Sequence, residues 1–591
     1  MKYYWNIFSY YFCLLFSSND ILIVMANKKI FFLILFLASN SWAQVRYIDY
    51  PSPFHSTIGK SGMVVSQNQA SSDIGVEILK MGGNAVDAAV AVGFSLAITL
   101  PRAGNLGGGG FMLIYLSNER KTIAVDFRSS APNNLSEKDF MFLKNNYDQR
   151  RYGYKASAVP GTVAGLLETH KRYGKLPLRQ ILRPVISQAK KGVYVSYDLN
   201  QAIGSAEQLL LDNESNNIYY ENKAPLKEHR LIKRPDLAWA LKEIAKNGQE
   251  AFYTGSISKK IVKAMQQNNG YITAKDLENY QPRFSQPIQT NYRDHKVLAH
   301  PPPAGGAAVL LEGLNIIENF ETDKMGPNSA SFVHLFAEAL QRGHMDRSRF
   351  IGDPLFYDVP IEKIISKQRA KSLAKDINLN LVTKSESINP ESLLNEGENT
   401  THYSIIDNDG NVVSNTYTLG YSFGSGVTIP GTGILLNNQM NNFAYQYGDP
   451  GVIDRSASIG NRFEPGKRPM STMSPIIVFD ENNSIKLITG SPGGALIPAA
   501  ILRVVTGVID FGLNLGEASM LPRIHKDWPY ENLLLERGFS KDTHNLLESF
   551  GHKIEESKTM GSTQSILISS KGVEGFADLR RPNAGVAIQN D

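Results

Sequence analysis

Residues 399–419 read NTTHYSIIDNDGNVVSNTYTL, and the rest of the chain is organised around them. Two arms rich in β-branched and aromatic residues flank an Asp-Gly pair, a pattern that predicts a β-hairpin. We place a three-residue loop at 408–410, with Gly410 in the left-handed conformation.

The register of this hairpin follows by counting outward from the loop. Asp407 faces Asn411, and the count then sets Thr400 opposite Thr418. One arm therefore begins with a threonine whose cross-strand neighbour carries a second hydroxyl. A strand that starts in this way calls for a chemical explanation.

Composition describes an ordinary globular protein. Of its 591 residues 42% are hydrophobic and 20% are charged, which is ample for a large buried core. The formal net charge of +5 is spread along the chain without a run of five basic residues. A patch that binds nucleic acid is therefore not expected.

The amino-terminal segment has the pattern of an export signal. From Met25, two lysines precede a short apolar run at 30–38, followed by small residues. This run is too short to span a bilayer, which takes roughly 20 residues. We interpret 1–43 as a removable leader with Met25 as the true start; the alternative is an uncleaved membrane anchor. The only cysteine, Cys13, lies in the leader, so the mature, exported chain (periplasmic or secreted) would lack thiols and disulfides.

The rest of the chain predicts a layered α+β fold. Strands are followed by a long helical region from about 160 to 380, and strands return after it. Between 86 and 100 the only charge is Asp87, which predicts a helix buried on all sides. Glycines at 107–110 permit close approach of the backbone to a ligand or to another strand. Further helices are expected at 160–174, 178–191, 235–247, 256–268, 328–343, 361–375, 496–511 and 540–550, and strands at 62–66, 111–116, 122–128, 434–437, 474–479, 485–489, 564–569 and 573–577.

Two common catalytic templates fit poorly. Residues 420–424, GYSFG, match G-x-S-x-G after a strand, but a nucleophile elbow must enter a helix and 425–431 are poor helix formers. The 11 histidines are scattered, and no H-E-x-x-H or Asp-x-Asp calcium loop is present. We expect neither a metal nor a cofactor.

A threonine that chain cleavage makes N-terminal fits better. Its hydroxyl attacks, and its free α-amine, with a pKa near 7.7–8.0, takes the proton. The polar segment 381–399 supplies a cleavable loop before Thr400, and GSPGGA at 490–495 supplies backbone N–H groups for an oxyanion. A plain β-hairpin would explain Thr400 as well.

Several motifs together resemble the γ-glutamyltransferase (glutathione hydrolase) family. The resemblance extends from about residue 60 to the end, with the motifs in the family's order. They are GGGGF at 107–111, DFR at 126–128, PGTVAG at 160–165, PPPAGG at 301–306, TTHYS at 400–404, GILLNNQM at 433–440, KRPMSTMSP at 467–475, GSPGG at 490–494 and MGSTQS at 560–565.

The resemblance implies an N-terminal-nucleophile hydrolase with a four-layer αββα sandwich. The precursor would cut itself between Asn399 and Thr400 into a large subunit, 44–399, and a small subunit, 400–591, which together form one domain. Thr400 would be nucleophile and base, supported by a hydrogen bond from Thr418. A γ-glutamyl-threonine ester would pass its acyl group to water, an amino acid or a peptide.

The resemblance also implies the remaining site residues. Gly493 and Gly494 would form the oxyanion hole. A guanidinium suits the α-carboxylate of the γ-glutamyl group because it can grip a carboxylate bidentately. The substrate-binding positions would be Arg128, Gln439, Asn442, Ser471 and Thr472.

The chain departs from the family where the substrate's α-ammonium is received. Gly420 stands where typical members have asparagine, and Asn442 where they have aspartate. Ile453 stands at the position of a tyrosine that often covers the site, and Tyr445 or Tyr447 are candidates to replace it.

These departures leave three hypotheses. The first is a hydrolase of glutathione and related γ-glutamyl amides. The second is an acylase of the same scaffold whose acyl group, such as glutaryl, lacks the α-amine. The third is an inactive relative that only binds.

Overall fold

From Phe54 onward the described residues form one compact unit. The predicted leader over 1–43 and the start at Met25 lie outside the part of the chain that the structure describes. The structure is a computed structural model, and it describes residues 52–385, 399–445 and 458–589.

Two seven-stranded antiparallel sheets form the centre of this unit. Sheet I has the strand order β23 (Gly585–Ile588), β2 (Met63–Ser66), β12 (Asn399–Ile406), β13 (Val412–Gly420), β3 (Gly109–Leu116), β4 (Lys121–Asp126) and β9 (Arg283–Ser285). Sheet II has the order β1 (Thr57–Gly59), β22 (Gly572–Ala577), β21 (Gln564–Ser569), β17 (Ile485–Thr489), β16 (Ile476–Phe479), β11 (His295–Ala299) and β10 (Ile288–Tyr292).

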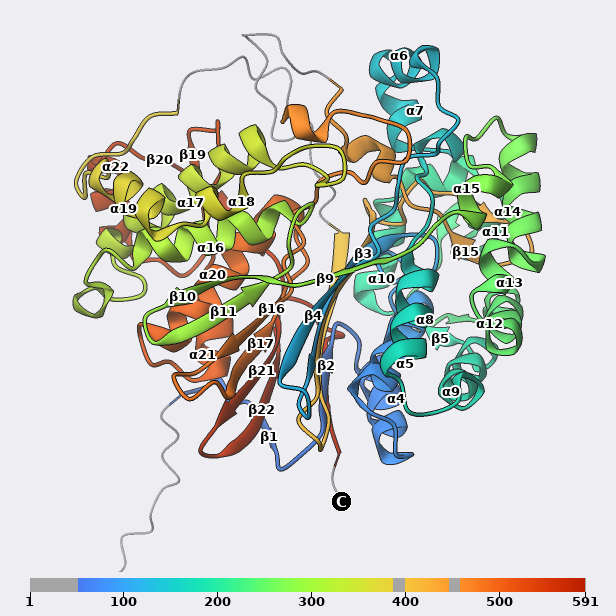
Figure 1. Ribbon diagram of the computed structural model, residues 1–591, viewed down its shortest axis with the longest axis horizontal. Helices are drawn as coiled ribbons and strands as arrows, with labels where there is room; N and C mark the ends of the chain where they lie inside the picture. The colour runs from blue at the N-terminus through green and yellow to red at the C-terminus, as the bar shows by residue number, and fades with distance from the viewer. Residues whose placement is uncertain (1–51, 386–398, 446–457, 590–591) are drawn as a thin grey trace, which may run out of the picture. The chain divides into compact units, whose positions relative to one another are not determined.

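Helices cover the outer face of each sheet, so the unit has four layers in the order αββα (Figure 1). This confirms the predicted fold class. The helices over sheet I are α4 (Gln69–Lys80), α5 (Ala85–Thr99), α8 (Thr162–Tyr173), α9 (Leu178–Lys191), α12 (Pro235–Asn247) and α14 (Ser256–Gln267). Those over sheet II are α16 (Gly305–Ile317), α17 (Ala330–Phe350), α19 (Lys367–Lys375), α20 (Ile497–Ile509) and α22 (Lys541–Ser549).

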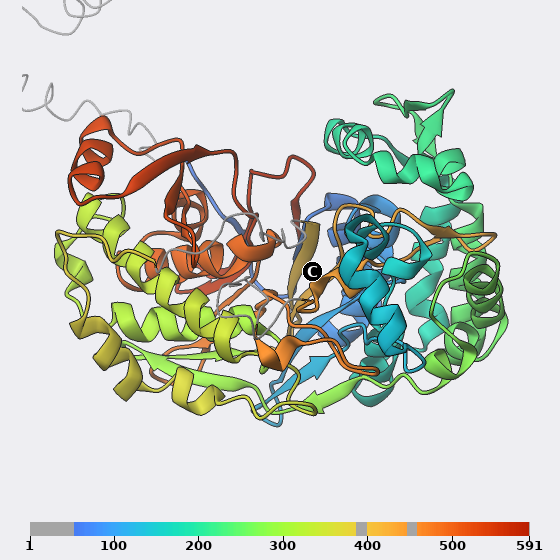
Figure 2. The same cartoon turned by 90° about the horizontal axis from the view of Figure 1, so that it is seen from above.

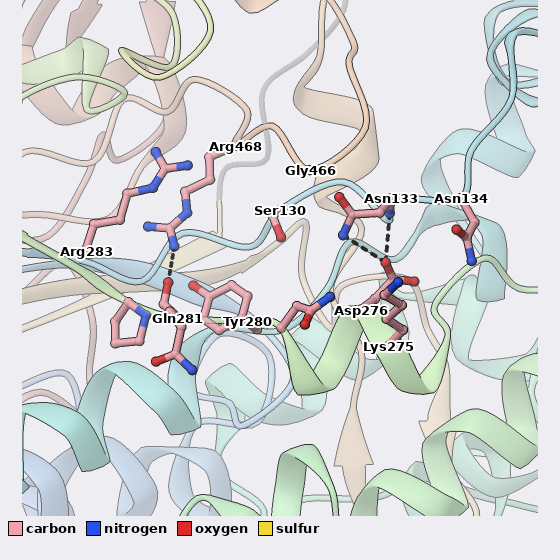
Figure 3. A pocket seen from close by; sticks show the side chains of 12 residues that line it. Ser130, Asn133, Asn134, Lys275, Asp276, Tyr280, Gln281, Arg283, Gly466 and Arg468 are labelled. Carbon is pink, nitrogen blue, oxygen red and sulfur yellow. Dashed lines mark hydrogen bonds between the residues drawn. The ribbon is translucent and has the colours of Figure 1, made fainter.

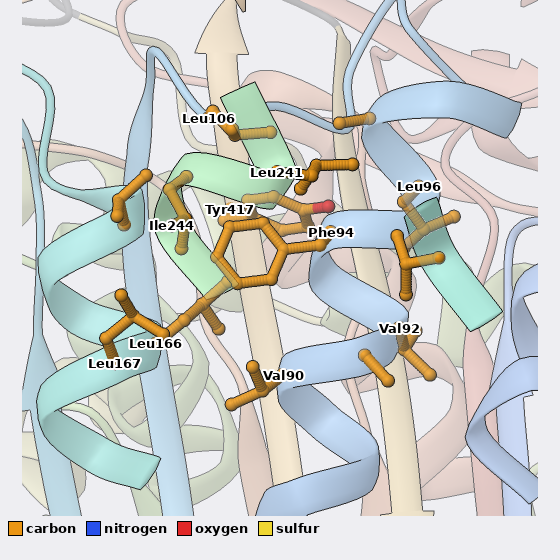
Figure 4. Packing of buried hydrophobic residues seen from close by; sticks show 14 of the residues in the cluster. Val90, Val92, Phe94, Leu96, Leu106, Leu166, Leu167, Leu241, Ile244 and Tyr417 are labelled. Carbon is orange, nitrogen blue, oxygen red and sulfur yellow. The ribbon is translucent and has the colours of Figure 1, made fainter. Parts of the chain in front are cut away.

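Separate apolar cores hold these layers together. The core between the sheets includes Val412 of sheet I and Ile488 of sheet II. Every residue of α5 is buried, as predicted for a helix without an exposed face. Figure 4 shows α5 packed against α8, α12 and Tyr417 of β13. Burial of each such large apolar side chain contributes about 1.5–3 kcal/mol, so α5 fixes sheet I from behind.

The hairpin at the centre of sheet I has the predicted register. Thr400 lies opposite Thr418, the Asp407 N–H donates to the Asn411 carbonyl at 3.0 Å, and Gly410 has a φ of +80°. Beyond Thr400 the register shifts by one residue, forming a bulge. Asn399 then pairs with Gly420, so Leu419 is the extra residue on β13.

The region 160–380 is mostly helical, as predicted, and the β10–β11 hairpin interrupts it and adds two strands to sheet II. One expectation was wrong in detail. The single helix expected at 361–375 is two, α18 (Ile361–Ile364) and α19, because the Ser366 hydroxyl accepts from the Arg369 N–H and begins a new helix. The break redirects the chain without touching the centre of the fold.

Candidate active site

Thr400 lies at the start of an inner strand and is only 4% exposed. Side chains of β12 alternate between the two faces of sheet I. Ser404 points toward sheet II, because its hydroxyl donates to the Gln564 carbonyl at 2.8 Å. Tyr403 points the other way, donating to the Ala89 carbonyl of α5 at 2.9 Å. Alternation therefore places the Thr400 side chain on the face toward sheet II.

Thr418 is held beside it by two neighbours. Its hydroxyl accepts from the Gly420 N–H at 2.8 Å, and its carbonyl accepts from Nε2 of Gln439 at 2.9 Å. This second bond orients the Gln439 amide, whose Oε1 is buried and has no donor among the described residues. A buried acceptor without a donor is costly, so Gln439 is suited to receive a ligand's N–H.

The glycine turn that follows β17 packs directly against the Thr400 strand. A Cβ on Gly490 would lie 2.4 Å from Cε1 and Nδ1 of His402, so only glycine allows this approach. Gly493 and Gly494 then take φ values of +132° and +56° and lead into α20. The amino end of a helix favours negative charge, which suits an oxyanion.

His402 is a neutral spacer between strand and turn. Since Ser404 Oγ donates to Gln564, it accepts from His402 Nε2 at 3.1 Å, which leaves Nδ1 to accept from the Thr416 hydroxyl at 2.8 Å. Burial lowers the pKa of His402 to about 3. His402 therefore carries no charge near Thr400 at neutral pH.

Arg128 is almost fully buried and reaches the loop that precedes Ser471. Its Nε donates to the Pro469 carbonyl at 3.2 Å, and its Nη2 donates to Oδ1 of Asn442 at 2.9 Å. The Arg128 carbonyl in turn accepts from the Tyr280 hydroxyl at 2.9 Å. Three segments distant in sequence therefore meet at one guanidinium.

Asn461 joins two of these segments. Its Nδ2 donates to the Asn442 carbonyl and its Oδ1 accepts from the Met470 N–H, both at 2.8 Å. Ser471 is fixed by its N–H, which donates to the Pro303 carbonyl at 3.0 Å, and Thr472 follows it in a buried position. The structure thus brings Arg128, Asn442, Ser471 and Thr472 to one region.

A polar cavity of about 580 Å³ lies behind the Arg128 loop (Figure 3). Tyr280 and Arg468 line it; Arg468 Nη2 donates to the Gln281 carbonyl at 2.5 Å, and Arg468 pairs with Asp126 at 2.8 Å. These contacts brace the backbone that carries Arg128, and the guanidinium of Arg128 does not line the cavity.

The departures from the family pattern have structural counterparts. Gly420 has a φ of +104°, and a Cβ there would lie 2.1 Å from Oδ1 of Asn438, so the local backbone is fitted to glycine. Tyr445 is buried, stacks on Phe140 and donates to the Met440 carbonyl at 3.0 Å. It is part of the core and does not cover the site. Tyr447 and Ile453 lie outside the described residues.

Sequence reasoning missed Asn461, Asn438 and the contact between Gly490 and His402. The glycine run at 107–110 proved to serve chain packing, since a Cβ on Gly108 would lie 2.2 Å from the Thr418 carbonyl. Among the described residues, no three His, Cys, Asp or Glu side chains are placed to hold a metal ion. No helix in the same residues is long and apolar enough to cross a membrane.

An αββα sandwich with a threonine at the start of an inner strand, facing a glycine turn from the second sheet, is the architecture of N-terminal-nucleophile hydrolases. Within that class the chain belongs to the γ-glutamyltranspeptidase family, whose model matches residues 71–588.

Relatives agree with this placement. The chain is 42% identical over 533 residues to a glutathione hydrolase proenzyme of Escherichia coli, covering 89% of this chain and 92% of that one. Among solved structures, a cephalosporin acylase from Bacillus halodurans has a TM-score of 0.81 at 27% identity, covering 93% of this chain and 99% of that one. A γ-glutamyltranspeptidase of Helicobacter pylori has a TM-score of 0.53 at 35% identity, covering 56% and 94%.

Proposed function

We propose that this protein is a self-processing hydrolase and transferase that cleaves γ-glutamyl amides, glutathione among them. The observation that carries the proposal is the pairing of Thr400 with Thr418 at the start of a strand whose His402 packs against Gly490, the first residue of the glycine turn 490–494. Family membership and the similarity to glutathione hydrolase proenzymes support the substrate class.

In the proposed reaction, cleavage between Asn399 and Thr400 frees the α-amine of Thr400. That amine takes the proton of the Thr400 hydroxyl, whose oxygen attacks the γ-carbonyl of the substrate. Thr418 orients the nucleophile, while the N–H groups of Gly493 and Gly494 stabilise the tetrahedral oxygen. The amine of the substrate's scissile amide takes up the proton and leaves. Water or an acceptor amine then cleaves the γ-glutamyl-threonine ester.

The γ-glutamyl end would lie between Arg128 and Gln439. Arg128, with Ser471 and Thr472, would bind the α-carboxylate. Gln439 Oε1, which has no donor among the described residues, would accept from the α-ammonium. The side-chain amide of Asn442, which Arg128 orients through a hydrogen bond to its Oδ1, would line the same part of the site.

A second candidate function is favoured by Asn442 and Gly420. Neither offers the ammonium a carboxylate or a side-chain acceptor, while Arg128 remains for an acyl carboxylate. An acylase acting on glutaryl-type amides would need this combination, and an acylase is among the similar solved structures.

The proposal includes processing and export. The precursor would yield a large subunit, 44–399, and a small subunit, 400–591, that remain together. The leader pattern over 1–43 supports a periplasmic or secreted location. Amino acids or peptides would serve as acceptors of the acyl group.

Two experiments test the proposal. On a denaturing gel, the purified mature protein should show two fragments split at Thr400, and Thr400→Ala should leave one band without turnover. Cleavage that persists in Thr400→Ala would assign the nucleophile to another residue, such as Thr401. Turnover of γ-glutamyl and glutaryl anilides is then compared, and faster turnover of the glutaryl compound would favour the acylase.

A further inference from the structure

A cationic aromatic cluster stands beside the candidate active site on α7 (Tyr147–Arg151), which lies next to α6 (Glu137–Asn145) in Figure 1. The Arg151 Cζ lies 4.7 Å from the ring centroid of Tyr147, 5.1 Å from that of Tyr152 and 4.7 Å from that of Tyr421. Such packing fixes the plane of a guanidinium through its faces and leaves its N–H edge for in-plane acceptors.

Arg151 has no anionic partner within the described ranges. No carboxylate there lies within 4.0 Å of it, and its Nε is buried with no acceptor among those residues. The neighbouring Arg150 differs, since its Nε donates to Oδ1 of Asn441 at 3.1 Å. Arg151 is therefore a positioned, half-buried cation without an anionic partner among those residues.

Asn438 ties this cation to the active site. Its Nδ2 donates to the Arg151 carbonyl at 3.0 Å, and its Oδ1 accepts from the Tyr421 N–H at 3.0 Å. Asn438 directly precedes Gln439, and Tyr421 directly follows Gly420. The cluster is thus attached at both of its ends to residues of the candidate acyl site.

The separation between Thr418 and the aromatic cluster around Arg151 is compatible with the length of a short peptide. Tyr421 is three residues beyond Thr418, so the two residues are at most about 10 Å apart along the chain. A dipeptide attached to the scissile carbonyl extends about 7 Å, and the arginine side chain covers the remainder. The acyl group's own carboxylate is already assigned to Arg128 on another segment.

We propose that Arg151, held in plane by Tyr147, Tyr152 and Tyr421, binds the terminal carboxylate of the peptide leaving group, and of the amino acid or peptide acceptor that later takes its place. The inference rests on the proposed γ-glutamyl function and adds the part of the substrate beyond the scissile amide. The two terminal nitrogens of the planar guanidinium can donate side by side to the two oxygens of a carboxylate. Arg151 is a binding residue and takes no part in proton transfer.

The test compares two γ-glutamyl substrates that differ only in the negative charge of the terminal carboxylate. They are glutathione and glutathione whose C-terminal glycine is a glycinamide, and glutamate release reports on both. The unsubstituted protein should prefer glutathione in kcat/KM by about tenfold or more, the discrimination typical of a charge-assisted pair. Arg151→Met keeps an apolar stem against the rings, and it should reduce the preference to about onefold.

Lys155→Met is the matched control. Lys155 Nζ also lies over an aromatic ring, 4.0 Å from the centroid of Phe142, one short helix further along the chain. Its removal should leave the preference unchanged. Cleavage into two fragments shows that each variant has folded.

The outcomes separate the two proposals. If the unsubstituted protein turns over neither donor nor a γ-glutamyl anilide, the proposed function fails. If it turns over both donors equally, or if the preference survives in Arg151→Met, the assignment of Arg151 is overturned while the function stands. The ratio in the unsubstituted protein decides this even where Arg151→Met does not fold.

Discussion

Asn442→Asp should shift the enzyme toward substrates that carry an α-amine. Because Oδ1 of Asn442 accepts from Arg128 Nη2 at 2.9 Å, the other end of its amide is an N–H donor. A donor cannot accept from the substrate's ammonium. An aspartate at the same position keeps one oxygen on Arg128 and presents a second, charged oxygen to the ammonium.

The size of the shift follows from hydrogen-bond energies. A hydrogen bond to a charged group contributes about 1.5–3 kcal/mol, against about 1 kcal/mol for a neutral one. Since Asn442 offers the ammonium no acceptor, the whole contribution of about 1.5–3 kcal/mol is gained, which corresponds to about ten- to 150-fold, since about 1.4 kcal/mol is a factor of ten. We expect kcat/KM for a γ-glutamyl anilide, divided by that for a glutaryl anilide, to rise by this factor.

The ratio is the right measurement because both donors carry the carboxylate assigned to Arg128. Any change in the Arg128 contact therefore cancels. Asn441→Asp is the control, since it adds the same charge one residue earlier, beside Arg150. A ratio that stays constant or falls in Asn442→Asp, or rises equally in Asn441→Asp, would refute the assignment of Asn442 to amine recognition.

Three further predictions test other parts of the site. Arg128→Lys should raise KM for γ-glutamyl donors about tenfold or more in initial-rate kinetics, since an ammonium cannot grip a carboxylate bidentately. Gly490→Ala places a Cβ 2.4 Å from His402, so kcat should fall at least about tenfold and the melting temperature should drop. In the control Gly204→Ala the nearest atom is 3.6 Å from the new Cβ, so kcat and the melting temperature should stay unchanged. Folding lowers the pKa of His402 from 6.5 to about 3, so the unfolded chain binds more protons between these two pH values. The free energy of unfolding is therefore highest above pH 6.5 and falls as the pH falls toward 3. The measurement is urea unfolding of the Thr400→Ala protein, which stays a single chain, with and without His402→Gln. The free energy of unfolding lost between pH 6.5 and pH 5 should be smaller by about 2 kcal/mol in the protein with His402→Gln. An unchanged loss would contradict the burial of a neutral His402.

The hairpin was predictable because its information is local. Alternating β-branched residues and a glycine at the left-handed position define both arms and their register. The β10–β11 hairpin lacks such a signal, since its turn contains Arg293 at a φ of +51°. That conformation is held by contacts distant in sequence, from the Arg293 N–H to Glu318 and from its Nε to Asp510. A single sequence does not display those pairings.

The candidate site likewise contains residues paired by local sequence and residues paired only by contacts distant in sequence. Thr400 and Thr418 are paired by the hairpin itself, so a count of residues brought them together. Arg128 and Asn442 meet across 314 positions of sequence, and only the resemblance to a family suggested that they belong to one site. Asn461, which joins Asn442 to the loop before Ser471, has no motif of its own.

This division has a consequence for how the protein's specificity can change. The groups assigned to bond cleavage are held mainly by backbone, through the hairpin register and the glycine turn at Gly490. The groups assigned to recognition are side chains: the amides of Gln439 and Asn442 on one 3-10 helix (Gln439–Asn442), and the guanidinium groups of Arg128 and Arg151. We therefore expect substitutions in the second set to alter substrate preference without affecting the proposed self-cleavage at Thr400. Asn442→Asp and Arg151→Met should both appear as two fragments on a denaturing gel, and an uncut band from either would mean that recognition and self-cleavage share the same groups.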